Sequence, residues 1–261
     1  MKTLSIASRT VALVAASIIV FAGMAFGVEI RVLVSGSFSA AYLELVPEFQ
    51  RATGHTVVTI GPAPSSGTSP TSIPGRLQRG EPVDVVIMVG DALEGLVKQG
   101  KIAAGTRVDL ARSGIGVAVR AGSPKPDIGS VDAFKRAMLE AKSLAYSSSA
   151  SGIYLSTELF PRLGIADQVK GKSRMIESGF YSAVLRGEAE IALGQISEIL
   201  PVPGLDFVGP LPAEIQKITV ISAGIAAGAK EPDAATVLIK FLASPAAARA
   251  ITKSAMEPMT P

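Results

Sequence analysis

Short apolar runs and amphipathic segments alternate along the chain from residue 28 onward. An apolar run at 30–34 leads through Ser35-Gly36-Ser37 into apolar residues at helical spacing between Tyr42 and Phe49, and a second apolar run follows at 56–60. Short apolar runs bounded by turn residues favour strands, whereas a period near 3.6 favours helices. The pattern therefore predicts a strand, a helix and a strand, the unit from which parallel sheets are built.

The same alternation continues to the C-terminus and predicts the rest of the framework. Further strands are expected at 83–88, 115–120, 191–193 and 218–226, and further helices at 71–79, after a capping Asp91, at 130–142, at 181–186 and twice near the C-terminus. We predict two α/β lobes, each a mostly parallel sheet flanked by helices, joined by two hinge crossings. Lobe 1 would comprise residues 28–115 and 220–261, and lobe 2 residues 116–219. Ligands of such sheets bind at the carboxyl ends of strands, beside helix N-termini.

The first 27 residues have the organisation of a signal peptide. Lys2 and Arg9 precede an apolar run at 11–21, and Ala25 and Gly27 are the small residues expected before a cleavage site. The run is shorter than the roughly 20 apolar residues that span a bilayer, so we favour cleavage after Gly27 over a membrane anchor. We expect a periplasmic monomer with no stable membrane insertion after cleavage.

Composition narrows the classes of protein that remain. The chain of 261 residues has a formal charge of +3, and loss of Lys2 and Arg9 with the signal peptide leaves +1. Aromatic residues make up 5% of the chain and form no basic, aromatic surface, which argues against nucleic acid as a partner. With no cysteine and only one histidine, His55, a zinc site or a Ser-His-Asp triad lacks its residues. We expect no metal and no cofactor.

Three expected strand-to-helix turns carry hydroxyl groups and glycine in place of large side chains. They are Ser35-Gly36-Ser37, then Ser65-Ser66-Gly67-Thr68, and last the run from Ser147 through Ser148, Ser149 and Ser151 to Gly152. Serine before a helix is a common N-cap, and a serine run is often a linker. A helix N-terminus also leaves N–H groups unpaired and attracts anions, and two lobes would bring the three turns to one cleft. We therefore predict a shared site for a small anionic ligand.

Two charged side chains are further candidates for this cleft. Arg76 follows the second turn, and it either faces solvent or pairs with a ligand carboxylate. Glu198 follows the expected strand at 191–193 and the polar pair Gly194-Gln195. The end of that strand should face the cleft, so we expect Gln195 and Glu198 there.

In order and spacing, the mature chain resembles the type II periplasmic solute-binding proteins, in the branch related to molybdate-binding proteins of ABC transporters. The resemblance is carried by IRVLVSGSFSAAYLELVPEFQRATGHTV, SSGT, RGEPVDVVIM, SGIGVAVRAG, the serine turn and RGEAEIALGQ. It implies a two-lobe fold that closes on its ligand, with an ABC permease as partner. It also implies that Ser35 or Ser37 and Ser66 contact an oxyanion, with backbone donors near Ser149. The tyrosine of the family falls at Gln195, which departs from the pattern for molybdate.

A narrower resemblance is to the aconitate isomerase subgroup of the same branch. It is carried by SIPGRLQRGEPVDVVI, DLARSGIGVAVRAGSPKPDI and AYSSSASGIYLS. An enzyme of this kind interconverts trans- and cis-aconitate by moving an allylic proton. It needs hydrogen-bond donors for three carboxylates, and Arg76 would be one of them. It also needs a general base, for which Glu198 and Tyr154 are candidates. Two functions stay open. The first is capture of molybdate or a small polycarboxylate for ABC-type uptake, which we place ahead, and the second is isomerisation of aconitate.

Overall fold

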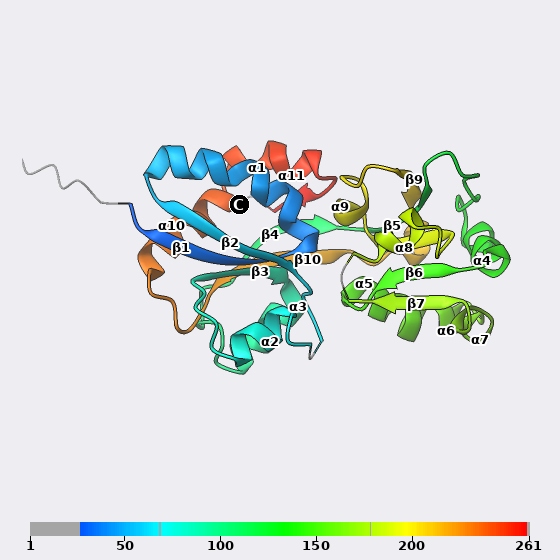
Figure 1. Cartoon of the computed structure of the whole chain (residues 1–261), viewed down its shortest axis with the longest axis horizontal. Coiled ribbons are helices and arrows are strands. Elements are labelled where there is room, and N and C mark those ends of the chain that lie inside the picture. The colour runs from blue at the N-terminus through cyan, green and yellow to red at the C-terminus, as the bar shows by residue number, and fades with distance from the viewer. Residues whose placement is uncertain (1–26, 68, 178, 260–261) are drawn as a thin grey trace, which may run out of the picture.

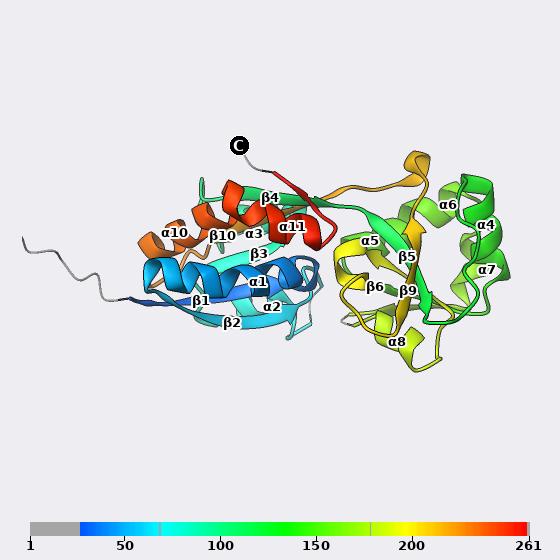
Figure 2. The ribbon, with the colours of Figure 1, turned by 90° about the horizontal axis from the view of Figure 1, so that it is seen from above.

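The computed structural model describes residues 27–67, 69–177 and 179–259, and it consists of two α/β lobes (Figure 1). Seen from above, the lobes lie side by side and the chain passes between them twice (Figure 2). The expected two-lobe α/β architecture is confirmed. Apart from Gly27, the expected signal peptide lies outside the described residues, and so does Thr68 of the second serine turn.

The first lobe is built on a six-stranded sheet with the order β11-β4-β10-β3-β1-β2. Its strands are β1 (Glu29–Ser35), β2 (Thr56–Ala63), β3 (Val85–Val89), β4 (Val108–Ser113), β10 (Thr219–Ile225) and β11 (Glu257–Pro258). The central strand β3 is buried along its whole length, because helices cover both faces of the sheet.

Helices of this lobe pack on the two faces of its sheet. One face carries α1 (Gly36–Thr53), α10 (Pro232–Leu242), the 3₁₀ turn η3 (Pro245–Ala247) and α11 (Ala248–Lys253), and the other carries α2 (Ile73–Gln78) and α3 (Gly90–Lys98). The side chains of Phe38, Tyr42, Leu45 and Phe49 recur at helical spacing in α1 and are buried against the sheet. Gly54 ends α1 in the left-handed conformation, with φ at 74°.

The second lobe has a five-stranded sheet with the order β7-β6-β8-β5-β9. Its strands are β5 (Ile115–Arg120), β6 (Leu144–Ser147), β7 (Ser173–Ile176), β8 (Ile191–Gln195) and β9 (Leu205–Pro210). One face packs α4 (Val131–Glu140), α5 (Ala150–Tyr154), the π-helical turn η1 (Leu155–Leu159), α6 (Phe160–Arg162), α7 (Ala166–Lys170) and the 3₁₀ turn η2 (Ala213–Ile215). The other face packs α8 (Tyr181–Leu185) and α9 (Ile196–Ile199).

The two crossings are held together by one side-chain amide. Gly114 lies on the first crossing, between β4 and β5, and Gln216 lies on the second, just before β10. The N–H of Ile115 donates to Oε1 of Gln216 at 2.7 Å, and Nε2 of Gln216 donates to the carbonyl of Ile115 at 2.9 Å. This pair of hydrogen bonds fixes one crossing against the other at the point where the chain changes lobe.

Several elements differ from the sequence-based expectation. Each sheet is mixed and not mostly parallel, because β10 and β4 pair antiparallel in lobe 1, as β5 does with β8 and β9 in lobe 2. Strands β7 and β9 were not predicted from the sequence, because they are only partly buried and lack a continuous apolar run. Asp91 lies in the first turn of α3 and does not cap it, since the helix begins at Gly90.

No single helix within the described ranges has the length and hydropathy of a membrane span. The segment pair Pro232–Leu242 and Pro245–Lys253 meets that test only jointly, across a bend of 57°.

A buried carboxylate joins three segments at the end of lobe 1 that lies away from the crossings. Asp84, which is 3% exposed, accepts hydrogen bonds from the backbone N–H groups of Arg31 at 2.8 Å, Lys230 at 2.7 Å and Glu231 at 3.2 Å. These bonds tie β1 and the start of α10 to the strand β3.

Replacing Asp84 by alanine should lower the free energy of unfolding by about 3 kcal/mol, because three backbone N–H groups lose the buried carboxylate that accepts from them. Urea titration followed by circular dichroism measures this value. The control is Glu48→Ala at an exposed position of α1, with an expected change of less than about 0.5 kcal/mol. Equal stability of Asp84→Ala and the unmutated protein would show that water replaces the carboxylate.

Candidate functional site

A cavity of 430 Å³ lies where strand ends and helix starts of the two lobes meet. Lobe 1 lines it with the start of α1, the loop after β2 and the end of β3. Lobe 2 lines it with the turn after β6, the segment between β7 and α8, the start of α9 and the loop 201–203. This is the place where ligands of open α/β sheets bind.

The first serine turn presents the N-terminus of an 18-residue helix to the cavity. Ser35 is extended and precedes α1, and its Oγ lies 2.9 Å from Oγ of Ser37. Ser37 and Gly36 line the cavity, whereas Ser35 lies behind them. The first turn of a helix leaves backbone N–H groups without intrahelical partners, so this end of α1 can donate to an anion.

The second serine turn divides its residues between two tasks. Ser65 lines the cavity. Oγ of Ser66 donates across the cleft to the carbonyl of Ser148 at 3.3 Å, so Ser66 links the lobes and does not line the cavity. Gly67 has φ at 98° and only shapes the turn. Of the described residues of this turn, only Ser65 therefore lines the cavity.

The third serine turn offers fewer free donors than we expected. Ser147 and Ser149 line the cavity, but the N–H of Ser149 donates to Oγ of Ser147 at 3.0 Å and the N–H of Ser148 donates to Ile176 at 3.0 Å. Ser151 and Gly152 do not line the cavity. Gly152 is instead required for packing, because a Cβ there would lie 1.6 Å from the carbonyl oxygen of Ser147. The hydroxyl groups of Ser147 and Ser149 also pair with each other.

Gln195 ends β8 at the cavity and is 2% exposed. Its Nε2 donates to Oγ1 of Thr219 on the second crossing at 2.9 Å, and Oε1 has no hydrogen-bond partner within the described part of the chain. The next turn carries Ser197, whose Oγ lies 3.3 Å from Oγ of Ser113 at the first crossing. Both contacts connect the cavity to the hinge.

Glu198 is a half-buried carboxyl group on the wall of the cavity between the lobes. It belongs to α9 of lobe 2, yet it lies against the start of α1 in lobe 1, where a Cβ on Gly36 would be 3.0 Å from its Oε1. The structure gives its carboxylate no hydrogen bond or ion pair among residues 27–67, 69–177 and 179–259. Enclosure away from water raises the pKa of Glu198 from 4.5 to about 7.

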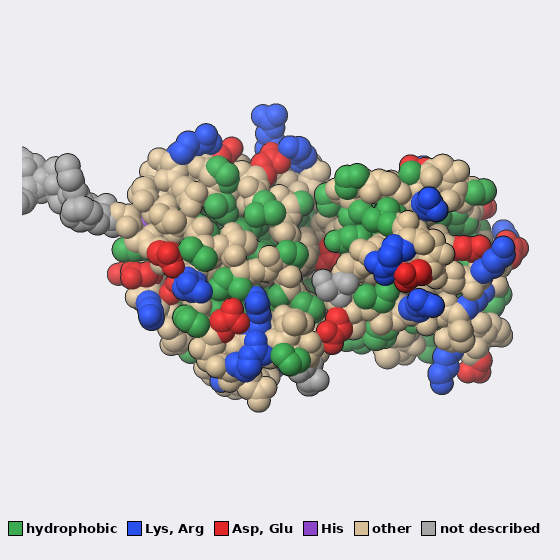
Figure 3. Space-filling view, viewed as in Figure 1, with side chains coloured by type: hydrophobic (Ala, Val, Ile, Leu, Met, Phe, Trp, Pro, Cys, Tyr) green, Lys and Arg blue, Asp and Glu red, His purple; other side chains and the backbone are tan. Residues whose placement is uncertain are grey.

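The charges around the cavity are acidic and not basic. Glu177 and Glu198 line it, and no lysine or arginine does so among the described residues. Acidic side chains are visible beside the groove between the lobes (Figure 3). The groups that this cavity offers to an anion are therefore neutral donors and a helix N-terminus. The described residues also contain no cluster of three or more side chains that could bind a metal ion.

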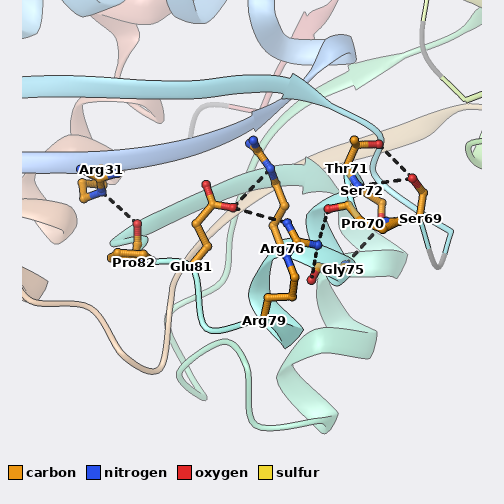
Figure 4. A network of polar contacts seen from close by, with 10 residues as sticks. All are labelled: Arg31, Ser69, Pro70, Thr71, Ser72, Gly75, Arg76, Arg79, Glu81 and Pro82. Atoms are coloured by element: carbon orange, nitrogen blue, oxygen red, sulfur yellow. Dashed lines mark hydrogen bonds and ion pairs between the residues drawn. The ribbon is translucent and has the colours of Figure 1, made fainter.

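Two sequence-based candidates lie away from the cavity. Arg76 was a candidate either for the solvent-facing surface or for pairing with a ligand carboxylate, and its Nε pairs with Oε2 of Glu81 at 3.3 Å in a network with Arg79 (Figure 4). The expectation missed that Glu81, five residues further along, provides a partner. Tyr154 is buried in lobe 2, where its hydroxyl donates to the carbonyl of Ile215 at 2.9 Å, and it does not line the cavity. It is therefore not placed to act as a base.

The structure also adds residues that sequence reasoning missed. They are Ser39 and Leu43 on α1, Glu177, Phe180 and Tyr181 before and in α8, Ser197, and the loop Pro201-Val202-Pro203. Ser39 and Leu43 follow the first turn at helical spacing, which was a usable signal. The others come from segments without a distinctive pattern.

Comparisons with known proteins agree with this geometry. The sequence model of the bacterial extracellular solute-binding protein family matches residues 30–257. An aconitate isomerase from Pseudomonas sp is 46% identical over 231 residues, covering 88% of both chains. The molybdate-binding protein ModA of Azotobacter vinelandii is 28% identical over 259 residues, covering 94% of this chain and 95% of its own.

Among solved structures, the periplasmic molybdate-binding protein of Azotobacter vinelandii superposes with a TM-score of 0.71 at 20% identity, covering 87% of this chain and 98% of its own. At this identity the likeness shows the shared two-lobe fold.

Replacing Glu198 by glutamine should stabilise the protein in a pH-dependent manner. Since the folded-state pKa of about 7 lies above the ordinary 4.5, the folded protein holds this proton more tightly, and its stability falls as the pH rises from about 4.5 to 7. Glutamine removes that loss. Thermal unfolding should give Glu198→Gln a higher Tm above pH 7 and an equal Tm below pH 4.5.

The control for this experiment is Glu177→Gln, at an exposed rim position, which should show no such pH-dependent gain. A constant difference between Glu198→Gln and the unmutated protein at all pH values would contradict the enclosure of the carboxyl group.

Proposed function

The chain belongs to the bacterial extracellular solute-binding protein family, and on this premise we propose that it is an exported isomerase that binds aconitate between its lobes and interconverts the trans and cis isomers. The observation that carries the proposal is Glu198, a carboxyl group without a charged partner that faces the cavity with its pKa raised to about 7. The aconitate isomerase that is 46% identical supports the choice of substrate.

The size of the cavity favours an organic acid. Pockets for organic ligands begin at roughly 300 Å³. The 430 Å³ between the lobes therefore leaves far more room than a four-oxygen anion such as molybdate requires. Leu43, Val89 and the loop 201–203 supply an apolar wall against which a carbon skeleton can lie.

The chemistry needs one base that can also return a proton. In the proposed reaction, the Glu198 carboxylate takes a proton from the methylene carbon of aconitate while the double bond moves by one position. It then gives the proton to the carbon that was formerly part of the double bond. A carboxyl group with a pKa near the working pH serves both steps, because it is neither fully protonated nor a very weak base.

Recognition of the carboxylates is assigned to the serine turns. Ser37 and Ser65 from lobe 1 and Ser149 from lobe 2 supply hydroxyl donors, and the first turn of α1 supplies backbone N–H groups. Gln195 adds a side-chain amide at the base of the site. Because donors come from both lobes, closure of the cleft would complete the site.

Capture for uptake is the second candidate, and it was the leading expectation from the sequence. The family match and the 28% identical molybdate-binding relative favour it. In this case the mature chain would be a periplasmic monomer, released by cleavage after Gly27, that delivers a small anion to an ABC permease. Capture alone, however, gives no chemical role to Glu198.

We expect purified mature protein to convert trans-aconitate to cis-aconitate, and chromatography measures the cis-aconitate that forms. Glu198→Gln should lower kcat by about 100- to 10,000-fold, because it removes the proton carrier. For the unmutated enzyme, kcat/KM should rise about tenfold per pH unit below pH 7 and level off above it, since the base must be ionised.

The matched control is Glu177→Gln, which removes the other acidic group of the cavity and should keep most of the activity. Absence of turnover by the unmutated protein would refute the isomerase. A thermal-shift panel of molybdate, tungstate, sulfate, citrate and aconitate then tests capture, and a flat response to all five would refute the anion site.

A further inference from the structure

The proposed proton transfer creates negative charge on the substrate, and the cavity must stabilise this charge without a cation. When the methylene proton leaves, the electron pair of its C–H bond forms the new double bond. The electrons of the old double bond move onto the vinyl carbon and into its carboxylate. No lysine or arginine lines the cavity among the described residues. Stabilisation of this charge therefore depends on neutral donors placed near Glu198.

Tyr181 is the side chain in the right place for this task. It begins α8 and lines the same cavity as Glu198, in the same lobe. Among the described residues, no other tyrosine lines the cavity: Tyr42, Tyr146 and Tyr154 are all buried elsewhere. Tyr181 itself is only partly buried and lies on the cavity wall.

The ring of Tyr181 is positioned by packing on the strand that leads to Glu198. Its neighbour Phe180 contacts it edge to face, with ring centroids 5.4 Å apart and planes at 67°. Phe180 in turn lies directly on Gly194 of β8, where a Cβ would be 2.2 Å from the ring atom Cζ. Gly194 precedes Gln195 and α9, so Tyr181 and Glu198 are fixed in one rigid frame.

The phenol also keeps its proton where Glu198 is ionised. Burial raises the pKa of Tyr181, and the negative charge of Glu198 raises it further. The cavity therefore holds a base and a neutral hydrogen-bond donor side by side at neutral pH. Such pairs of groups divide the acid and base roles of an active site.

We propose that Tyr181 is a further catalytic residue, whose O–H donates a hydrogen bond to the substrate carboxylate that gains charge when Glu198 removes the allylic proton. The phenol does not lose its proton, which travels only from carbon to Glu198 and back to the second carbon. This inference rests on the proposed isomerase function and adds to it the group that stabilises the intermediate.

Tyr181→Phe tests the inference, because phenylalanine keeps the ring packing on Phe180 and removes only the hydroxyl. We expect kcat for aconitate to fall by about 100-fold, the scale of losing one donor to a developing charge. KM should change by less than about threefold. Tricarballylate is the saturated tricarboxylate and cannot form the intermediate. Its affinity should also change by less than about threefold, because the hydrogen bond from Tyr181 strengthens only in the transition state.

Tyr146→Phe is the matched control. Tyr146 is a buried tyrosine of β6 in the same lobe, and it does not line the cavity. The Tyr146→Phe variant should therefore keep the kcat of the unmutated enzyme. An undiminished kcat in Tyr181→Phe, with an active unmutated enzyme, overturns the role of Tyr181 alone. An equal loss of tricarballylate affinity and of kcat/KM also overturns it, because Tyr181 would then be a ground-state contact. An unmutated protein without turnover overturns the proposed function and this role together.

Discussion

The carboxyl group of Glu198 lies between two lobes, and among the described residues no cation lines the cavity beside it. Water would solvate the ionised form of such a group, and burial weakens that solvation, which raises its pKa to about 7. An anionic ligand makes ionisation still less favourable. The remaining features of the site are consistent with this constraint: the donors are neutral hydroxyl groups, an amide and the start of α1, and none carries a charge that would hold Glu198 ionised.

The scaffold supports this arrangement by connecting the lobe 2 wall of the cavity to the two crossings. Gln195 bonds to Thr219 on one crossing, Ser197 pairs with Ser113 on the other, and Gln216 holds the two crossings together. Polar groups of both crossings therefore adjoin the cavity wall that carries Glu198.

The sequence was sufficient for the architecture and for part of the site. Apolar runs interrupted by small turn residues predicted strand ends, and the structure brings five of the residues chosen there, Ser37, Ser65, Ser149, Gln195 and Glu198, to one cavity. Arg76 and Tyr154 were misplaced because their partners, Glu81 and Ile215, become neighbours through local loop geometry and through the crossing. Tyr181 was missed because its position depends on the packing of Phe180 against Gly194, a contact between residues that no periodicity connects.

Gly36 shows how one lobe can restrict the sequence of the other. Its backbone is ordinary helix, so alanine would be the better helix former at this position if α1 alone were considered. The methyl group of alanine would meet Oε1 of Glu198 at 3.0 Å, and the carboxyl group would have to move away from the helix. The amino acid tolerated at position 36 therefore depends on the residue at position 198. During divergence of the family, these two positions would be expected to change as a pair.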